Sequence, residues 1–157
     1  MAVKLVKANP PCSKDELDRL AEKMGAQPPL DYVHFLRKTN GGRPEPNVVR
    51  VNAQTRTTIT EFYGAAKVVR QKSAFSDRLP SDTWPVALTE SGNLILLKAN
   101  ENWAISFWDH ELEKETPLAA SFAEFQGALA PFSVHDVELD TEQVVSAWID
   151  PSLLKGR

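Results

Sequence analysis

The sequence predicts an α+β fold in which a twisted, mostly antiparallel sheet is flanked by N-terminal and C-terminal helices. Amphipathic helix patterns occupy residues 13–25 and 28–42, and another begins at Ser121. Between them, three apolar runs lie within residues 84–108 and are separated by short polar turns. This spacing is typical of consecutive antiparallel strands that pack against helices.

The length and composition fit one globular domain, which we expect to span residues 1–157. The chain is 42% hydrophobic and 25% charged, and both values are ordinary for such a domain. Its first residues lack the apolar run of a signal peptide, and no stretch is long enough to cross a bilayer. Cys12 is the only cysteine, so an intramolecular disulfide is impossible. We therefore expect a cytoplasmic protein with no membrane partner.

The first predicted helix has a recognisable signal at each end. Ser13 and Glu16 have the spacing of a capping box, and Gly25 is a typical helix stop. The helix is predicted to be half buried, because its apolar residues recur at helical spacing on one face. These residues are Leu17, Leu20, Ala21 and Met24.

The second predicted helix follows a pair of prolines. Proline suits a helix start, because its missing N–H would have no partner there. The buried face is predicted from Tyr32, Val33, Phe35 and Leu36. We expect the segment Asn40-Gly41-Gly42 to end this helix, since glycine adopts the left-handed cap conformation without steric cost.

The middle of the chain predicts a hairpin at residues 47–62 and a short helix at residues 65–75. Three consecutive strands follow at residues 84–88, 94–99 and 103–108, with turns at residues 90–93, which include Gly92, and at residues 100–102. The run 94–97 is apolar on both faces, which predicts a central strand covered on each side.

The C-terminal part predicts two more helices. Ser121 and Glu124 repeat the capping-box spacing. An apolar stripe at helical spacing follows, formed by Phe122, Phe125 and Leu129. A last helix is expected near residues 141–149.

Four segments, taken together and in this order, resemble the SUKH superfamily, also called the Smi/Knr domain. They are ELDRLAEKMG, PPLDYVHFLRKTNGG, the strand pair around SGNLILL and ISFWDHE, and LAASFAEFQGAL, which together span residues 13–129. The most specific pieces are residues 30–42 with their closing Asn40-Gly41-Gly42, and residues 107–111 with Trp108, followed by Ser121-Phe122 and Phe125. Val48-Val49 departs from the aromatic strand that similar proteins often carry.

The resemblance implies a protein-binding domain that uses no catalytic residue and no cofactor. Bacterial domains of this type mostly act as immunity proteins beside polymorphic or contact-dependent toxins. Fungal relatives act as regulatory scaffolds that join signalling or cell-wall factors. We therefore expect an immunity protein that binds a cognate toxin, and a regulatory scaffold is the alternative.

Residue patterns for catalysis or metal binding agree with a binding role. None of the three histidines has the spacing of a metal site or a catalytic triad. His34 is expected on a polar helix stripe with Asp31 and Lys38. Asp109-His110-Glu111 is the densest ionisable cluster, but adjacent strand residues point to opposite faces, so we expect it to stabilise a turn or face a partner.

Charge is divided unevenly along the chain. Residues 1–80 hold 14 basic and eight acidic side chains, whereas residues 81–157 hold four basic and 13 acidic ones. Aromatic residues are not interleaved with the basic ones, so we expect no direct nucleic-acid binding. Complementary charge selects partners, and the acidic half predicts a basic toxin, for example a nuclease-type domain.

The residues predicted to contact this partner are acidic or aromatic and lie in the second half. Each carboxylate has an alternative role as a solvated surface charge. The candidates are Glu101, Trp103, Asp109, His110, Glu111, Glu113 and Glu115. No catalytic residue and no metal ligand is predicted.

Overall fold

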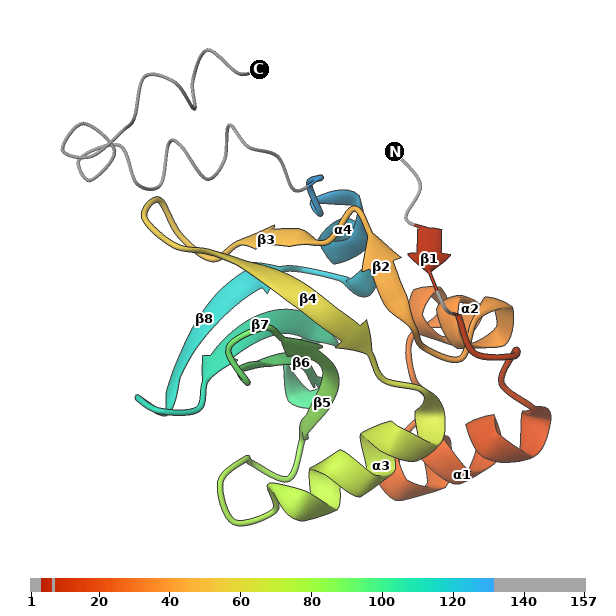
Figure 1. The fold of residues 1–157 in the computed structure, drawn as a ribbon. Helices are drawn as coiled ribbons and strands as arrows, with labels where there is room; N and C mark the ends of the chain where they lie inside the picture. Colours follow the sequence, from red (N-terminus) through yellow and green to blue (C-terminus); the bar gives the residue numbers. More distant parts are fainter. Residues whose placement is uncertain (1–3, 7, 132–157) are drawn as a thin grey trace, which may run out of the picture.

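The computed structural model describes residues 4–6 and 8–131, and its centre is a six-stranded, strongly curved sheet (Figure 1). Strands that are neighbours in the sheet are also neighbours in the sequence, and every pair is antiparallel. In order across the sheet they are β3 (Val48–Arg50), β4 (Arg56–Phe62), β5 (Thr83–Thr89), β6 (Leu94–Lys98), β7 (Ala104–Asp109) and β8 (Lys114–Ala119). Helices flank this sheet, which confirms the predicted α+β fold.

The other described elements surround the sheet. β1 (Lys4–Val6) pairs antiparallel with β2 (Arg43–Glu45). The helices are α1 (Lys14–Met24), α2 (Leu30–Lys38), α3 (Ala65–Ala74) and α4 (Phe122–Gly127), and the 3₁₀ turn η1 (Ala99–Glu101) connects β6 with β7. Among the helices described, none has the length and apolar character needed to span a membrane.

Helix α1 begins and ends as its sequence predicts. The Ser13 hydroxyl accepts the backbone N–H of Glu16 at 3.1 Å, and the Glu16 carboxylate accepts the backbone N–H of Ser13 at 3.2 Å. Gly25 follows the helix in the left-handed conformation, with φ 70°. Leu20 is fully buried, and α1 packs against α3. The predicted capping box and glycine stop are confirmed.

Helix α2 ends differently from the prediction. It stops at Lys38, and the residue that caps it, Thr39, has an extended backbone. Gly41 and Gly42 do not cap the helix; instead, Gly42 bridges Phe62 just before β2 begins. A Cβ on Gly41, whose φ is 90°, would lie 2.6 Å from the backbone oxygen of Phe62. The predicted glycine cap is wrong: Gly41 lets the chain pass close to the backbone of residues 62–64, and Gly42 pairs antiparallel with Phe62.

The remaining predicted elements within the described residues are largely confirmed. The hairpin of β3 and β4, helix α3 and the antiparallel strands β5, β6 and β7 all form. Ser121 caps α4 by accepting the backbone N–H of Glu124 at 3.1 Å. Strands β1, β2 and β8 were not predicted, and the helix expected near residues 141–149 lies outside the described residues.

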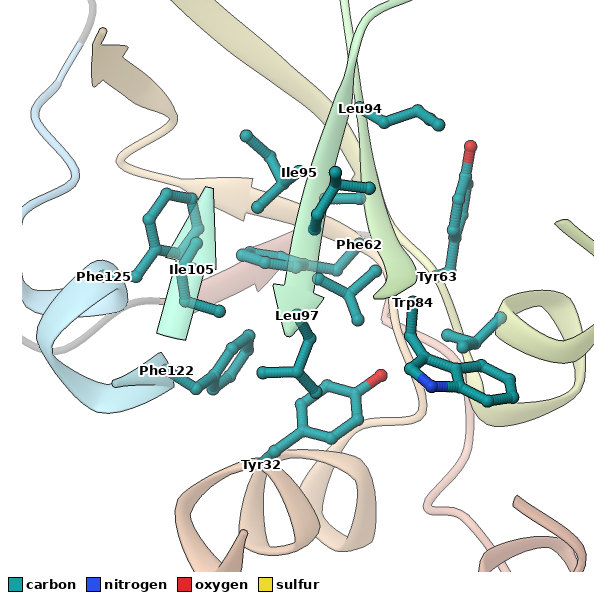
Figure 2. Packing of buried hydrophobic residues seen from close by; sticks show 14 of the residues in the cluster. Tyr32, Phe62, Tyr63, Trp84, Leu94, Ile95, Leu97, Ile105, Phe122 and Phe125 are labelled. Carbon is teal, nitrogen blue, oxygen red and sulfur yellow. The ribbon is translucent and has the colours of Figure 1, made fainter. Parts of the chain in front are cut away.

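The hydrophobic core joins the sheet to α2 and α4 through aromatic rings (Figure 2). Phe122 of α4 lies 5.0 Å from both Tyr32 and Phe35 of α2, measured between ring centroids, and 5.7 Å from Phe62 of β4. The side chains of β6 from Leu94 to Leu97 are at most 1% exposed. The prediction that this strand is central and covered on both faces is therefore confirmed. Leu36 and Phe125 are also buried, as expected.

Candidate partner-binding surface

The turn between β7 and β8, residues 110–113, is named the hairpin tip. Asp109, the last residue of β7, shapes it: its Oδ1 accepts the backbone N–H of Glu111 at 2.9 Å and that of Leu112 at 3.1 Å. Aspartate commonly stabilises turns in this way. Glu111 is exposed, and Leu112 is 72% exposed. The hairpin tip therefore presents an apolar side chain next to a carboxylate.

Arg78, in the segment that follows α3, holds one side of the hairpin tip. Its Nε lies 3.0 Å from a carboxylate oxygen of Glu113, and its guanidinium group donates to the backbone carbonyl of His110. The guanidinium carbon also lies 4.9 Å from the ring centroid of Trp108, within the range of a cation–π contact. Phe75 packs edge-on against the same ring, with 5.7 Å between centroids. These contacts fix the hairpin tip against the α3 side of the molecule.

Asn93, from the turn between β5 and β6, holds the other side of the hairpin tip. Its Oδ1 accepts the backbone N–H of His110 at 3.0 Å and lies 2.5 Å from Nδ1 of the imidazole. The neighbouring Gly92 has φ 81°, and a Cβ there would meet the His110 ring at 3.4 Å. His110 is thus tied to the adjacent turn by both its backbone and its side chain.

A second group of predicted residues surrounds Lys98, at the end of β6. This lysine is 8% exposed, and its Nζ lies 2.6 Å from a carboxylate oxygen of Glu115 and 2.9 Å from one of Glu101. Burial lowers the pKa of Lys98, but the hydrogen bonds that its ammonium group donates to Glu115 and Glu101 outweigh this effect, and the pKa is raised above its ordinary value. Trp103 is half buried and donates its backbone N–H to the Lys98 carbonyl at 2.9 Å.

The structure thus divides the predicted contact residues into two groups. Asp109, His110, Glu111 and Glu113 lie at the hairpin tip, and Glu101, Trp103 and Glu115 lie around Lys98. Three of the carboxylates, those of Glu101, Glu113 and Glu115, form ion pairs within the chain.

Three supporting residues were missed by the sequence reasoning. Lys98 could have been identified, because it is a charged residue that directly follows the apolar run 94–97. Arg78 and Asn93 had no such signal, because their partners lie 35 and 17 residues away in the sequence. In the part of the chain that the structure describes, no three His, Cys, Asp or Glu side chains are grouped so that they could hold a metal ion.

A groove of about 520 Å³ lies on a different part of the molecule, between α2, α4 and β1. Its lining includes Asp31, His34 and Lys38 of α2, so the predicted grouping of these three side chains is confirmed. Asp31 connects the two helices, because its Oδ2 accepts the backbone N–H of Ala123 in α4 at 2.9 Å. The other lining residues are Leu5, Phe35, Thr39, Ala123 and Gln126.

Comparison with known proteins identifies the family of this chain. Residues 11–126 match the SMI1 / KNR4 family (SUKH-1), in agreement with the resemblance seen over residues 13–129. The chain is also similar to the SPbeta prophage-derived uncharacterized protein YokK of Bacillus subtilis (strain 168). The two are 26% identical over 170 residues, which cover 92% of this chain and 88% of that protein. On this match, the chain belongs to the SMI1 / KNR4 family (SUKH-1).

Proposed function

We propose that this protein is a cytoplasmic immunity protein, one domain over residues 1–157, that neutralises a cognate toxin by binding it and catalyses no reaction itself. The observation that carries the proposal is the exposed, acid-rich hairpin tip in a chain of the SUKH-1 family. The similarity to a prophage-derived protein supports a role in conflict between genetic elements. No cofactor is needed for this role.

The hairpin tip is suited to binding because its shape is set before a partner arrives. Arg78 and Asn93 hold its backbone, so little conformational entropy remains to be lost on association. Glu111 and Leu112 project from this fixed turn. A carboxylate beside an apolar side chain fits a basic protein surface that has a small apolar pocket. The charge speeds encounter and selects the partner, and the buried apolar contact slows dissociation.

The acidic residues of the second half extend this surface only in part. Residues 81–131 hold eight acidic and two basic side chains, and the other five acidic residues of the second half lie outside the described residues. Glu101 and Glu115 already bind Lys98, so they add less free negative charge than their number indicates. The preferred partner is a basic toxin domain of the nuclease type, whose active site is blocked sterically or electrostatically.

Co-expression tests the proposal directly. The toxin domain encoded beside this gene is produced with wild-type protein, with Glu111→Lys and with Glu22→Lys, a control that reverses an exposed carboxylate on α1. We expect rescue of growth and a purified complex with wild type and with the control, and loss of both with Glu111→Lys. Growth arrest despite folded wild-type protein would refute neutralisation. A complex that forms without rescue would instead indicate the regulatory scaffold role.

A further inference from the structure

The groove between α2, α4 and β1 has the chemistry of a docking site for an acidic, apolar turn. Its floor includes Phe35, which is 8% exposed, and Leu5, which is half buried. Its rim carries Lys38 and His34, both exposed. An apolar floor with an exposed lysine at its rim favours a segment that has an apolar side chain next to a carboxylate.

Both carboxylate oxygens of Asp31 are already engaged by backbone N–H groups. One carboxylate oxygen accepts the backbone N–H of Tyr32 at 2.7 Å, and the other accepts that of Ala123 at 2.9 Å. Such charge-assisted bonds hold the carboxylate in place. Lys38 is exposed and forms no ion pair within the described residues, so it is the cation in the groove that can meet an incoming carboxylate.

The hairpin tip of this same chain has the complementary chemistry. Leu112 is one of two large apolar residues that are strongly exposed among the described residues, and Glu111 lies directly beside it, also exposed. Because Glu113 is paired with Arg78, Glu111 is the carboxylate available to meet a cation from outside. Leu112 would pack against the apolar floor of the groove, and Glu111 would form an ion pair with Lys38 at its rim.

The position of the two surfaces decides how they can meet. In Figure 1 the turn that precedes β8 lies on the opposite side of the molecule from α2 and β1. A molecule therefore cannot fill its own groove with its own hairpin tip. We propose that the hairpin tip of one molecule docks, through Leu112 and Glu111, into the α2–α4 groove of a second copy, in a head-to-tail contact.

A head-to-tail contact leaves one hairpin tip and one groove free on each pair. Such contacts are heterologous, so they extend into chains unless the rotation closes a ring. We expect the contact between one turn and one groove to bury less than the ~1,200 Å² of a stable complex, so association should be weak and should increase with protein concentration. The same hairpin tip would then be covered in associated molecules and exposed in free ones.

Sedimentation of the full-length protein over a range of concentrations tests this contact. We expect wild type to sediment as a mixture whose average mass rises with concentration. A tip variant, Leu112→Asp, and a groove variant, Lys38→Glu, are each expected to remain monomeric, while the control Glu22→Lys associates like wild type. All three changes lie at exposed positions, so we expect each variant to be folded, and circular dichroism checks this.

Mixing the variants gives the sharpest result. The tip variant keeps its groove and the groove variant keeps its hairpin tip, so together they form one contact and stop at a dimer. The double variant Glu111→Lys with Lys38→Glu restores the charge pair in reversed order and should regain association. A wild type that stays monomeric at every concentration, or single variants that associate like wild type, would overturn the proposal. No toxin takes part in these measurements, so their outcome is independent of neutralisation.

Discussion

The side chain of Asn40 accepts a hydrogen bond from the backbone N–H of Ala65, the first residue of α3, with 2.8 Å between Oδ1 and the amide nitrogen. The residue at the usual capping position of α3 is Gly64, which has no side chain to do this. The side-chain Nδ2 of Asn40 also donates to a carboxylate oxygen of Glu16 in α1, at 3.2 Å. One side chain in the segment after α2 therefore connects α1 with the start of α3.

Replacing Asn40 with alanine should destabilise the protein by about 1–2 kcal/mol, the usual cost of losing a helix cap. The change leaves the N–H of Ala65 and one Glu16 oxygen without this partner. Urea unfolding measures the free energy of unfolding. Asn100→Ala, at an exposed position in η1, is the control and should change stability by less than about 0.5 kcal/mol. Equal stability of the two variants would show that Asn40 does not act as a remote cap.

Two glycine-to-alanine changes should differ clearly in their effect on stability. At Gly41 a Cβ would lie 2.6 Å from backbone atoms of both Gly64 and Phe62, and φ is 90°. We expect Gly41→Ala to cost more than about 2 kcal/mol, because both the clash and the left-handed backbone oppose it. Gly127 lies in α4 with nothing within 4 Å of the added atom, so Gly127→Ala should be neutral or stabilising by up to about 1 kcal/mol. Thermal unfolding compares the two, and similar midpoints would contradict the expectation.

Lys98→Met should destabilise the protein by about 2 kcal/mol, the scale of a lost charge-assisted hydrogen bond. The change leaves Glu115, whose side chain is 30% exposed, without its cation. Adding Glu115→Gln to Lys98→Met should recover part of the loss, because the uncompensated charge is removed. The control is Lys14→Met, whose 3.6 Å pair with Asp18 is largely exposed and should contribute less than about 0.5 kcal/mol. Denaturant titration of wild type and the three variants measures the free energy of unfolding. Equal losses for Lys98→Met and Lys14→Met would contradict a stabilising role of the buried ion pair.

Cys12 should react slowly with iodoacetamide in the folded protein. Burial, with a smaller contribution from Glu16, raises the pKa of the Cys12 thiol from 9.0 to about 11. At pH 8 the reactive thiolate is then about a hundredfold rarer than in the unfolded chain. Mass spectrometry of alkylation with and without urea gives the ratio of rates. Equal rates in both conditions would show that the thiol is not protected.

The protein should lose stability as the solution becomes alkaline. The folded-state pKa values of Cys12 (about 11), Tyr63 (about 12) and Lys98 all lie above their ordinary values, the first two because of burial and that of Lys98 because the hydrogen bonds of Glu115 and Glu101 outweigh burial. Each group therefore holds its proton more tightly when folded. The stability they provide is complete below pH 9 and is lost as pH rises through 11 and 12. Urea unfolding between pH 7 and pH 11 measures this, and a flat profile would contradict it.

Local chemistry in the sequence was sufficient for most helices and strands. Ser13, Glu16 and Gly25 define α1 because capping and left-handed termination involve residues within a few positions of each other. The run of four apolar residues in β6 likewise predicts that this strand is buried on both faces. Strand β8 was not predicted because half of its segment, KETPLA, is polar and it contains a proline. Its backbone hydrogen bonds to β7, rather than its own residues, make it a strand.

The sequence by itself determined the fold class, the ends of α1 and the acid-rich composition around residues 109–115, since these depend on neighbours along the chain. Only the tertiary structure decided that Gly41 permits a close backbone approach rather than a helix cap, and that Arg78 and Lys98 pair with Glu113 and Glu115. The physical reason is that clashes and ion pairs depend on distances in space, which the curvature of the sheet sets between residues far apart in the sequence.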